Sequence, residues 1–513
     1  MCDLRGRFSI DGVTTRHLPD SSVRTARPAW AWWVVAATSV SALLWLFGTG
    51  LHPRPGLAAL APLPVLLLAP RVSARTTFAA AFGSWFLGAL PYLRYFLHTV
   101  EQPPLSAFGL VLGTATIYAG LLLLTRFLVR HGRFAAAILA LPAGWVLMEY
   151  LISRAGPFGA WWSLAYTQSA VLPVIQVAAL TGWLGVSFLV LLVPAALAVL
   201  IDTATPRHTR IRCTAAALTM AVAVCGYGYA RLAQPTGATV PVGLVAVAQP
   251  EDYVPVDSPD GQDMITRVVA EVERLADRGA RAIVLPEKAW RATDSTLPLL
   301  SGPLTEVATR RDVHVIAGLV LTRADASVNA AIDFPTGVVY EKHYLVPGLE
   351  SDLRPGTAWT RVPGTSWALA ICFDLDRPAL VRTNRAQGAT LLLVPALDFR
   401  EDRWLHSRMA VLRGVESGLG IARAPQLGQL VASDSRGRIL AAADTDITVT
   451  RSVLAAIPEP GPETFYARYG DWFAALAALL FALTLTAAAA SLRTIRESRP
   501  RRQRSRVWAA HRN

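Results

Sequence analysis

The sequence predicts a fold in two parts: a polytopic α-helical membrane domain of about eight spans, and an α/β domain outside the membrane. Three observations support this expectation. Nearly all the long apolar runs fall in the first 230 residues, whereas residues 240–460 have interspersed charges and short apolar strands that alternate with helical periodicity. Charged residues make up only 17% of the 513-residue chain, against about a quarter in an average soluble protein.

The spans are predicted from apolar runs, because a bilayer core takes about 20 apolar residues as a helix. These runs lie near residues 30–48, 57–70, 77–97, 107–129, 134–152, 185–201, 213–230 and 472–490. The stretch 153–184 is also apolar, but glycines and prolines interrupt it and it is rich in aromatic residues. Amphipathic rings favour the headgroup level, so an interfacial or re-entrant segment is expected there.

The orientation follows from the arginines, which flank the apolar runs. A net charge of +13 could suggest a nucleic-acid partner. This distribution instead follows the positive-inside rule, so no nucleic acid is expected and anionic lipid headgroups are the expected partners. The predicted organisation is listed from the N-terminus: a cytoplasmic segment 1–29, a transmembrane domain 30–232, an extracytoplasmic catalytic domain 238–460, a transmembrane helix 472–490 and a basic cytoplasmic tail 491–513.

Within the globular part, short apolar strands alternate with helices, which predicts a sheet covered by helices. Strands are expected at 239–249, 281–287, 314–321, 328–334, 367–372 and 390–396. Helices are expected at 264–276, from Pro378 and at 402–416, with a hairpin at 429–440. The sequence has no Gly-rich phosphate loop and no metal-spaced Cys/His cluster.

Three polar residues stand at the ends of predicted strands: Glu287, Lys342 and Cys372. Taken singly, each is more often structural than catalytic. Together they predict a nucleophilic site, in which Cys372 attacks a carbonyl as a thiolate, Glu287 takes the thiol proton and Lys342 stabilises the oxyanion. A helix entry near Pro378 is expected to favour the thiolate through the helix dipole.

The residues around these three positions resemble a known family. Leu285-Pro286-Glu287, Tyr340-Glu341-Lys342-His343 and Ile371-Cys372-Phe373-Asp374 resemble, in order, the three signature boxes of the nitrilase (carbon–nitrogen hydrolase) superfamily. The run KHYLVPGLE, which ends at Glu350, resembles more specifically the lysine box of the apolipoprotein N-acyltransferases. Segments 144–151, 156–188, 406–418 and 465–473 also look like that family, so the likeness covers about residues 30–490.

The resemblance implies a nitrilase-like αββα sandwich on a multi-pass protein of the bacterial cell membrane, with the catalytic domain on the extracytoplasmic side. It also implies a ping-pong reaction that needs no metal and no diffusible cofactor. Cys372 would take the sn-1 acyl chain of a phospholipid as a thioester, and the chain would then pass to the α-amino group of the diacylglyceryl-cysteine that begins an apolipoprotein. Glu287 would be the general base and Lys342 the oxyanion partner, with Glu350 supporting the site.

The chain departs from the family pattern beside the cysteine, because Phe373 and Asp374 stand where the family usually has Tyr and Glu. Both are interpreted as residues that support the site. Three alternatives remain open: a membrane-tethered amidase or hydrolase that passes the acyl group to water, a catalytically weakened lipoprotein-binding homologue, and a transporter with an accessory domain. A transporter would need ionisable residues within the spans, whereas Arg94 and Glu149 lie near span ends.

Overall fold

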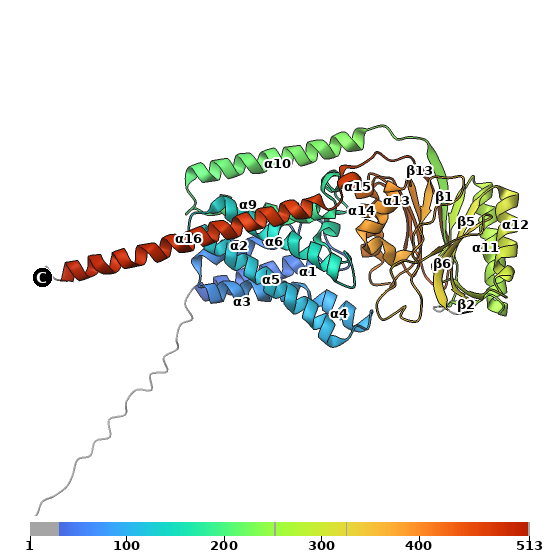
Figure 1. Ribbon diagram of the computed structural model, residues 1–513, viewed down its shortest axis with the longest axis horizontal. Helices are drawn as coiled ribbons and strands as arrows, with labels where there is room; N and C mark the ends of the chain where they lie inside the picture. The colour runs from blue at the N-terminus through green and yellow to red at the C-terminus, as the bar shows by residue number, and fades with distance from the viewer. Residues whose placement is uncertain (1–29, 251–252, 325, 511–513) are drawn as a thin grey trace, which may run out of the picture.

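The computed structural model describes residues 30–250, 253–324 and 326–510. The predicted cytoplasmic segment 1–29 and the last three residues of the predicted tail lie outside this part. The molecule is elongated, with a helical bundle at one end and an α/β sandwich at the other (Figure 1). The helices α10 and α16 both run from the sandwich side to the opposite end of the bundle.

Six helices in the described part of the chain are long and apolar enough to cross a membrane. They are α1 (Trp30–Gly48), α5 (Pro104–Arg130), α6 (Phe134–Ala155), α9 (Trp183–Ile201), α10 (Arg207–Ala233) and α16 (Trp472–Ala510). The protein is therefore a membrane protein, as predicted. The total of about eight spans stays a prediction.

Two of the predicted spans are built from shorter helices. The run 57–70 contains only α2 (Leu63–Leu68) and the 3₁₀ helix η1 (Ala69–Arg71), and the run 77–97 is divided into α3 (Ala74–Gly88) and α4 (Leu90–His98). Pro91 lies in the first turn of α4. Proline lacks an N–H and clashes with a preceding helical turn, so α3 cannot continue through this position.

The segment 153–184 folds into short helices that pack beside the bundle. They are η2 (Leu164–Gln168), α7 (Leu172–Ile175) and α8 (Ala178–Thr181). The buried carboxylate of Glu149 on α6 holds the start of this segment, because it accepts hydrogen bonds from Leu164 N at 2.9 Å and from Ser163 Oγ at 3.0 Å. Ser187 Oγ on α9 donates to the same carboxylate at 2.7 Å. Glu149 thus faces the bundle and ties three elements together.

The α/β part contains two sheets, as the alternation of strands and helices predicts. One sheet has the strand order β13-β1-β3-β5-β4-β2, with β6 and β7 continuing from β5, and the other has the order β12-β11-β10-β9-β8. The strands of the first sheet are β1 (Thr239–Ala246), β2 (Val254–Pro255), β3 (Ala282–Val284), β4 (Trp290–Thr293), β5 (His314–Thr322), β6 (Ser327–Phe334), β7 (Val338–Glu341) and β13 (Arg451–Pro458). Those of the second are β8 (Trp367–Leu369), β9 (Leu391–Leu397), β10 (Gly420–Gln426), β11 (Gln429–Ser433) and β12 (Ile439–Asp444).

The two sheets face one another across an apolar core, and helices cover their outer faces. The helices α11 (Pro259–Asp277) and α12 (Pro298–Arg311) cover the first sheet. The helices α13 (Pro378–Ala386) and α14 (Arg403–Ser417) cover the second sheet, and the short α15 (Phe465–Tyr469) leads into α16. This arrangement is an αββα sandwich. The helices α13 and α14 lie between the second sheet and the bundle (Figure 1), and they share one continuous core with the membrane helices.

Candidate active site

The three residues predicted to react lie just beyond the ends of strands. Glu287 follows β3, and its N–H donates to Ala396 O at 3.1 Å. Lys342 follows β7, and its N–H donates to Asn329 O at 2.8 Å. Cys372 follows β8 and opens the 3₁₀ helix η3 (Cys372–Asp376). Strand ends of this kind fix the backbone while the adjoining loop presents the side chain, and all three side chains line one cavity.

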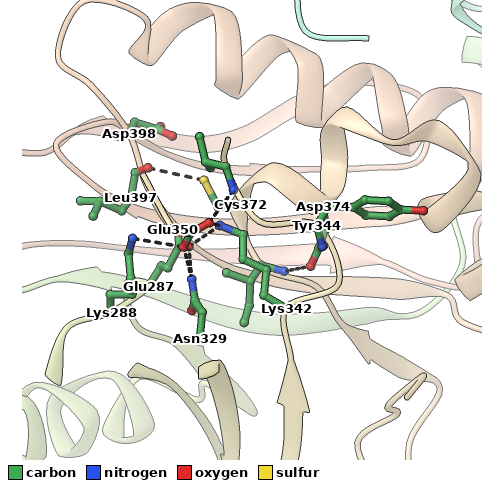
Figure 2. Close-up of polar contacts among 12 residues, drawn as sticks. Glu287, Lys288, Asn329, Lys342, Tyr344, Glu350, Cys372, Asp374, Leu397 and Asp398 are labelled. Carbon is green, nitrogen blue, oxygen red and sulfur yellow. Dashed lines mark hydrogen bonds and ion pairs between the residues drawn. The ribbon is translucent and has the colours of Figure 1, made fainter. Parts of the chain in front are cut away.

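The ammonium of Lys342 is held between two carboxylates. Its Nζ lies 2.7 Å from Glu287 Oε1 and 2.7 Å from Glu350 Oε2 (Figure 2). All three side chains are almost fully buried. Burial alone would lower the pKa of Lys342, but the charges of Glu287 and Glu350 outweigh it and raise that pKa. Lys342 is therefore a fixed cation beside the thiol.

Two further residues contact the carboxylates of this cluster, one by hydrogen bonds and one by an ion pair. Sequence reasoning missed both. The Nδ2 of Asn329 on β6 donates to Glu287 at 2.6 Å and to Glu350 at 2.7 Å. The Nζ of Lys288 lies 3.1 Å from Glu350 Oε1. Burial would raise the pKa of Glu350, but Lys342 and Lys288 lower it to about 2. Glu350 is thus ionised at neutral pH and bridges the two lysines.

Cys372 has a strained backbone and a neutral thiol. Its φ is +43°, in the left-handed region that non-glycine residues seldom adopt. Its Sγ contacts Leu397 O at 3.4 Å. Burial, followed by the charge of Glu287, raises the pKa of the thiol well above its ordinary range, although Lys342 and Arg423 oppose this. The expectation that a helix at Pro378 favours the thiolate is wrong, because η3 intervenes and burial dominates.

Asp374 points away from the thiol and fastens η3 to the loop that carries Lys342. Its Oδ2 accepts from Tyr340 OH at 2.7 Å and from Ile371 N at 2.9 Å, and its Oδ1 accepts from Tyr344 N at 2.9 Å. Burial raises the pKa of this carboxyl. Phe373 lines the cavity. The carboxylate of Asp374 therefore holds the backbone beside Cys372 and the loop after Lys342, and Phe373 forms part of the cavity wall.

The cavity has a volume of about 510 Å³ and lies between the sandwich and the bundle. On the sandwich side it reaches Glu287, Lys342 and Cys372. On the other side its wall is apolar and comes from α4, the loop after it and the segment that follows α6. This wall consists of Tyr95, Phe96, Val100, Phe158 and Trp161. The thiol thus opens onto an apolar space whose wall belongs to the membrane-spanning half of the chain.

A third side of the cavity is built around His406 on α14. Its Nδ1 lies 3.1 Å from Asp402 and 3.5 Å from Asp398, and Asp398 forms a buried two-point ion pair with Arg423 at 2.7 and 2.5 Å. Burial alone would lower the pKa of His406, but Asp402 and Asp398 raise it to about 9. The hydroxyl of Tyr95 on α4 donates to Asp402. No sequence signal connects these dispersed residues.

Among the residues that the structure describes, no group of three or more His, Cys, Asp and Glu side chains could hold a metal ion. The carboxylates nearest Cys372 are instead tied to lysine, asparagine and arginine. The arrangement is suited to nucleophilic attack by a thiol with the aid of an adjacent base and a fixed cation.

Residues 41–196 match the family described as the apolipoprotein N-acyltransferase N-terminal domain. Curated relatives with the name apolipoprotein N-acyltransferase align over most of the chain. The protein from Geobacter metallireducens is 27% identical over 475 residues, which cover 82% of this chain and 89% of that one. The protein from Bradyrhizobium diazoefficiens is 27% identical over 401 residues, covering 68% and 73%. The protein from Bordetella bronchiseptica is 26% identical over 523 residues, covering 91% and 88%.

Solved structures of the nitrilase superfamily resemble the sandwich. An amidase from Nesterenkonia aligns with 46% of this chain and 94% of its own, at 18% identity and a TM-score of 0.38. Nit3 of Saccharomyces cerevisiae, a member of branch 10 of that superfamily, aligns with 45% of this chain and 94% of its own, at 18% identity and a TM-score of 0.37.

The protein is a membrane enzyme, with an αββα sandwich that packs against a bundle of apolar helices. Its cysteine, lysine and glutamates converge on a cavity between the two parts. The family that the chain resembles is that of the apolipoprotein N-acyltransferases, whose N-terminal domain matches residues 41–196. The resemblance inferred from the sequence is confirmed.

Proposed function

We propose that the protein transfers an acyl chain from a phospholipid, through a thioester on Cys372, to the α-amino group of the diacylglyceryl-cysteine that begins an apolipoprotein. One observation carries this proposal: the cavity that holds Cys372 has an apolar wall built from Tyr95, Phe96 and Trp161 of the membrane-spanning half. A hydrocarbon chain can lie against this wall while its ester carbonyl reaches the thiol. Relatives aligned over most of the chain bear the corresponding name.

In the first half-reaction, Cys372 Sγ attacks the sn-1 ester carbonyl and Glu287 takes the thiol proton. The base is needed because the thiol is neutral in this buried site. Lys342 stabilises the oxyanion that forms, and its position between Glu287 and Glu350 is fixed before the substrate arrives. The carbon–oxygen bond then breaks. Glu287 returns the proton to the glycerol oxygen, so that lysophospholipid leaves and a thioester remains.

In the second half-reaction, the α-amino group of the acceptor attacks the thioester carbonyl as a neutral amine. Glu287 takes a proton from the amine, the carbon–sulfur bond breaks and the amide forms. The proton then passes from Glu287 to the thiolate of Cys372, which restores the resting site. Both half-reactions use the same base and the same oxyanion partner, as expected of a ping-pong mechanism with one covalent intermediate.

The two substrates are membrane lipids or lipid-anchored proteins, so we place the reaction at the outer surface of the bacterial cell membrane. In this orientation the sandwich is extracytoplasmic, and the basic first turns of α10 and the basic end of α16 are cytoplasmic. The start of α10 and the end of α16, whose sequences are rich in arginine, lie at the end of the bundle opposite the sandwich (Figure 1), which supports this orientation through the positive-inside rule.

A membrane-tethered hydrolase is the second candidate, because the same thioester can be attacked by water. The aromatic wall favours the acyltransferase, since a hydrolase of small amides needs no cavity that is continuous with membrane helices. A binding homologue without catalysis would not need the buried charge cluster of Glu287, Lys342 and Glu350, which is costly to bury unless it is fully paired.

The test is a two-substrate assay on the purified protein in detergent. A phospholipid labelled in its sn-1 chain is incubated with a diacylglyceryl-cysteine peptide, alongside Cys372→Ala as the matched control. We expect label in an amide on the peptide α-amino group, and none with Cys372→Ala. Label recovered only as free fatty acid would establish the hydrolase instead. No turnover of labelled phospholipid by the folded wild type would refute both activities and leave the binding homologue.

A further inference from the structure

Lys288 is a second lysine at the site, and its backbone is strained. The flanking amides are fixed, because Glu287 N donates to Ala396 O at 3.1 Å and Ala289 N donates to Gly318 O at 3.0 Å. Between them Lys288 has a φ of +49°. Residues other than glycine seldom adopt this left-handed region. Lys288 lines the cavity, and its side chain is only 15% exposed.

The ammonium of Lys288 has hydrogen-bonding capacity that its described contact does not use. Its Nζ lies 3.1 Å from Glu350 Oε1, and an ammonium has three N–H donors. The neighbouring cations are more fully engaged. Lys342 lies between two carboxylates, and Arg400 binds Asp446 with both terminal nitrogens, at 2.5 and 3.2 Å. Lys288 is therefore well suited to bind an anion that enters the cavity.

We propose that Lys288 binds the phosphodiester of the phospholipid donor and so selects donors that carry a phosphate. This assignment rests on the proposed acyltransferase function. The two lysines are held at opposite oxygens of one carboxylate, with Lys342 on Glu350 Oε2 and Lys288 on Oε1 (Figure 2). In a phospholipid only the glycerol unit separates the sn-1 ester carbonyl from the phosphodiester. An ester held at Cys372 and Lys342 thus brings the phosphate toward Lys288.

The charges of the site support the same assignment. Glu287 and Glu350 balance Lys342 and Lys288, so the cluster is neutral as a set. Without Lys288 it would have a surplus negative charge facing an anionic phosphodiester, and like charges repel strongly in a partly desolvated cavity. Lysine binds phosphate as a point charge and does not require the planar geometry of an arginine fork. A single flexible ammonium can therefore contact both Glu350 and the phosphate.

The experiment compares two donors that have the same labelled acyl chain at the same glycerol position: phosphatidylethanolamine and diacylglycerol, which has no phosphate. The rate at which label appears on Cys372 is measured against donor concentration for the wild type, Lys288→Gln and Lys288→Arg in detergent. We expect Lys288→Gln to raise the half-saturating concentration of phosphatidylethanolamine about tenfold. We also expect the ratio of phosphatidylethanolamine to diacylglycerol efficiency to fall about tenfold, and Lys288→Arg to restore most of it.

A proportional loss with both donors in Lys288→Gln would overturn the assignment, because Lys288 would then act only as a counter-charge for Glu350. Failure of Lys288→Arg to restore the donor ratio would overturn it as well. If the folded wild type forms no acyl-enzyme with either donor, the proposed function itself fails, and the role of Lys288 fails with it. The wild-type acyl-enzyme thus separates failure of the function from failure of the assignment.

Discussion

At the scale of single residues, the site places a neutral thiol beside Glu287, the residue that we propose as its base. Cys372 is buried among opposing charges, and burial together with Glu287 raises the pKa of its thiol. Lys342 and Arg423 oppose this effect without cancelling it. The thiolate is therefore expected to form when a substrate is bound and Glu287 takes the proton, which protects the resting cysteine from indiscriminate reaction.

Alkylation of Cys372 tests this description through its pH dependence. Because the pKa of the thiol is raised, less thiolate is present at each pH than in a free cysteine, whose pKa is about 8.5. We expect iodoacetamide to modify Cys372 slowly at pH 7, and its rate to rise only at pH values above those of a free-cysteine peptide. The measurement should use a variant with Cys2→Ser, Cys213→Ser and Cys225→Ser, so that only modification of Cys372 is measured. A rate at pH 7 equal to or above that of the peptide would contradict the prediction.

Glu350 gives a second prediction at this scale, because its pKa is lowered to about 2. A lowered carboxyl pKa stabilises the fold above the unfolded-state pKa of about 4.3, and this contribution is lost as the pH falls toward 2. Glu350→Gln should therefore lower the thermal unfolding midpoint at pH 7, by an amount equivalent to roughly 3 kcal/mol of stability. The difference from wild type should shrink by pH 3. A difference that is independent of pH would mean that Glu350 is not held ionised by the lysines.

The sequence predicted Glu287, Lys342 and Cys372 from their places at strand ends, and it predicted Glu350 only from the resemblance of the run KHYLVPGLE to the family's lysine box. It could not predict Lys288 or Asn329. Lys288 lies beside a motif residue but has its orientation set by a positive φ, and Asn329 lies in the middle of the strand Ser327–Phe334. A buried asparagine in an apolar strand indicates a polar partner, but only the fold identifies that partner as the pair Glu287 and Glu350.

At the scale of elements, the helix that begins with Cys372 is fastened to the membrane-spanning half. Ala160 N donates to Asp376 O at 2.8 Å, and the guanidinium of Arg377 reaches the carbonyls of Ser153, Gly156 and Pro157 at 3.2, 3.3 and 2.6 Å. The loop that follows α6 therefore helps to position η3. The apolar segment that glycine and proline interrupt thus lies beside Cys372, the proposed nucleophile.

Gly159 tests this connection, because its φ is +58° and a Cβ there would lie 2.3 Å from Asp376 O. We expect Gly159→Ala to displace η3 and slow acyl-enzyme formation about tenfold or more. Gly132→Ala is the matched control: Gly132 has a φ of +72°, but a Cβ there meets nothing within 4 Å. Both variants incur the left-handed penalty of about 1 kcal/mol, so the clash should separate them in a single-turnover assay. Equal rates for the two variants would show that the loop does not position η3.

Apolar periodicity predicted some strands and helices of the sandwich and missed others. The strands β1, β5 and β9 and the helices α11 and α14 lie where apolar periodicity predicts them. The strand β10 (Gly420–Gln426) was missed, because its sequence GIARAPQ places Arg423, Pro425 and Gln426 in a strand that is buried throughout. Arg423 is accommodated by the carboxylate of Asp398, a long-range contact that no local pattern reveals. The helix α12 was also missed, since Pro303 lies within it.

At the scale of the whole molecule, the sandwich and the bundle are not independent bodies. The helices α13 and α14 contribute to the same apolar core as α3, α5, α6 and α9. The cavity at Cys372 is completed only by residues from both parts. This arrangement could not be read from the sequence, which gave two regions of different composition but no surface by which they join. Residues of the membrane-spanning half thus form one wall of the candidate active site.

The orientation of the molecule can be tested with a membrane-impermeant maleimide on intact spheroplasts. In a background with the native cysteines replaced, we expect Ser295→Cys, on the exposed loop before α12, to be labelled from outside. We expect Thr203→Cys, on the exposed loop between α9 and α10, to be labelled only after lysis. The reverse pattern would place the sandwich in the cytoplasm and remove the outer-surface substrates from its reach.

The central claim is that Cys372 carries the acyl chain between the two substrates. The most direct measurement is mass spectrometry of the peptide containing Cys372 after the purified protein is incubated with phospholipid and no acceptor. The account predicts a mass increase equal to one acyl group on this peptide, sensitive to neutral hydroxylamine and lost when the diacylglyceryl-cysteine peptide is added. An unmodified Cys372 in folded protein that nevertheless transfers the chain would contradict it, because transfer would then be direct and the cysteine would not be the nucleophile.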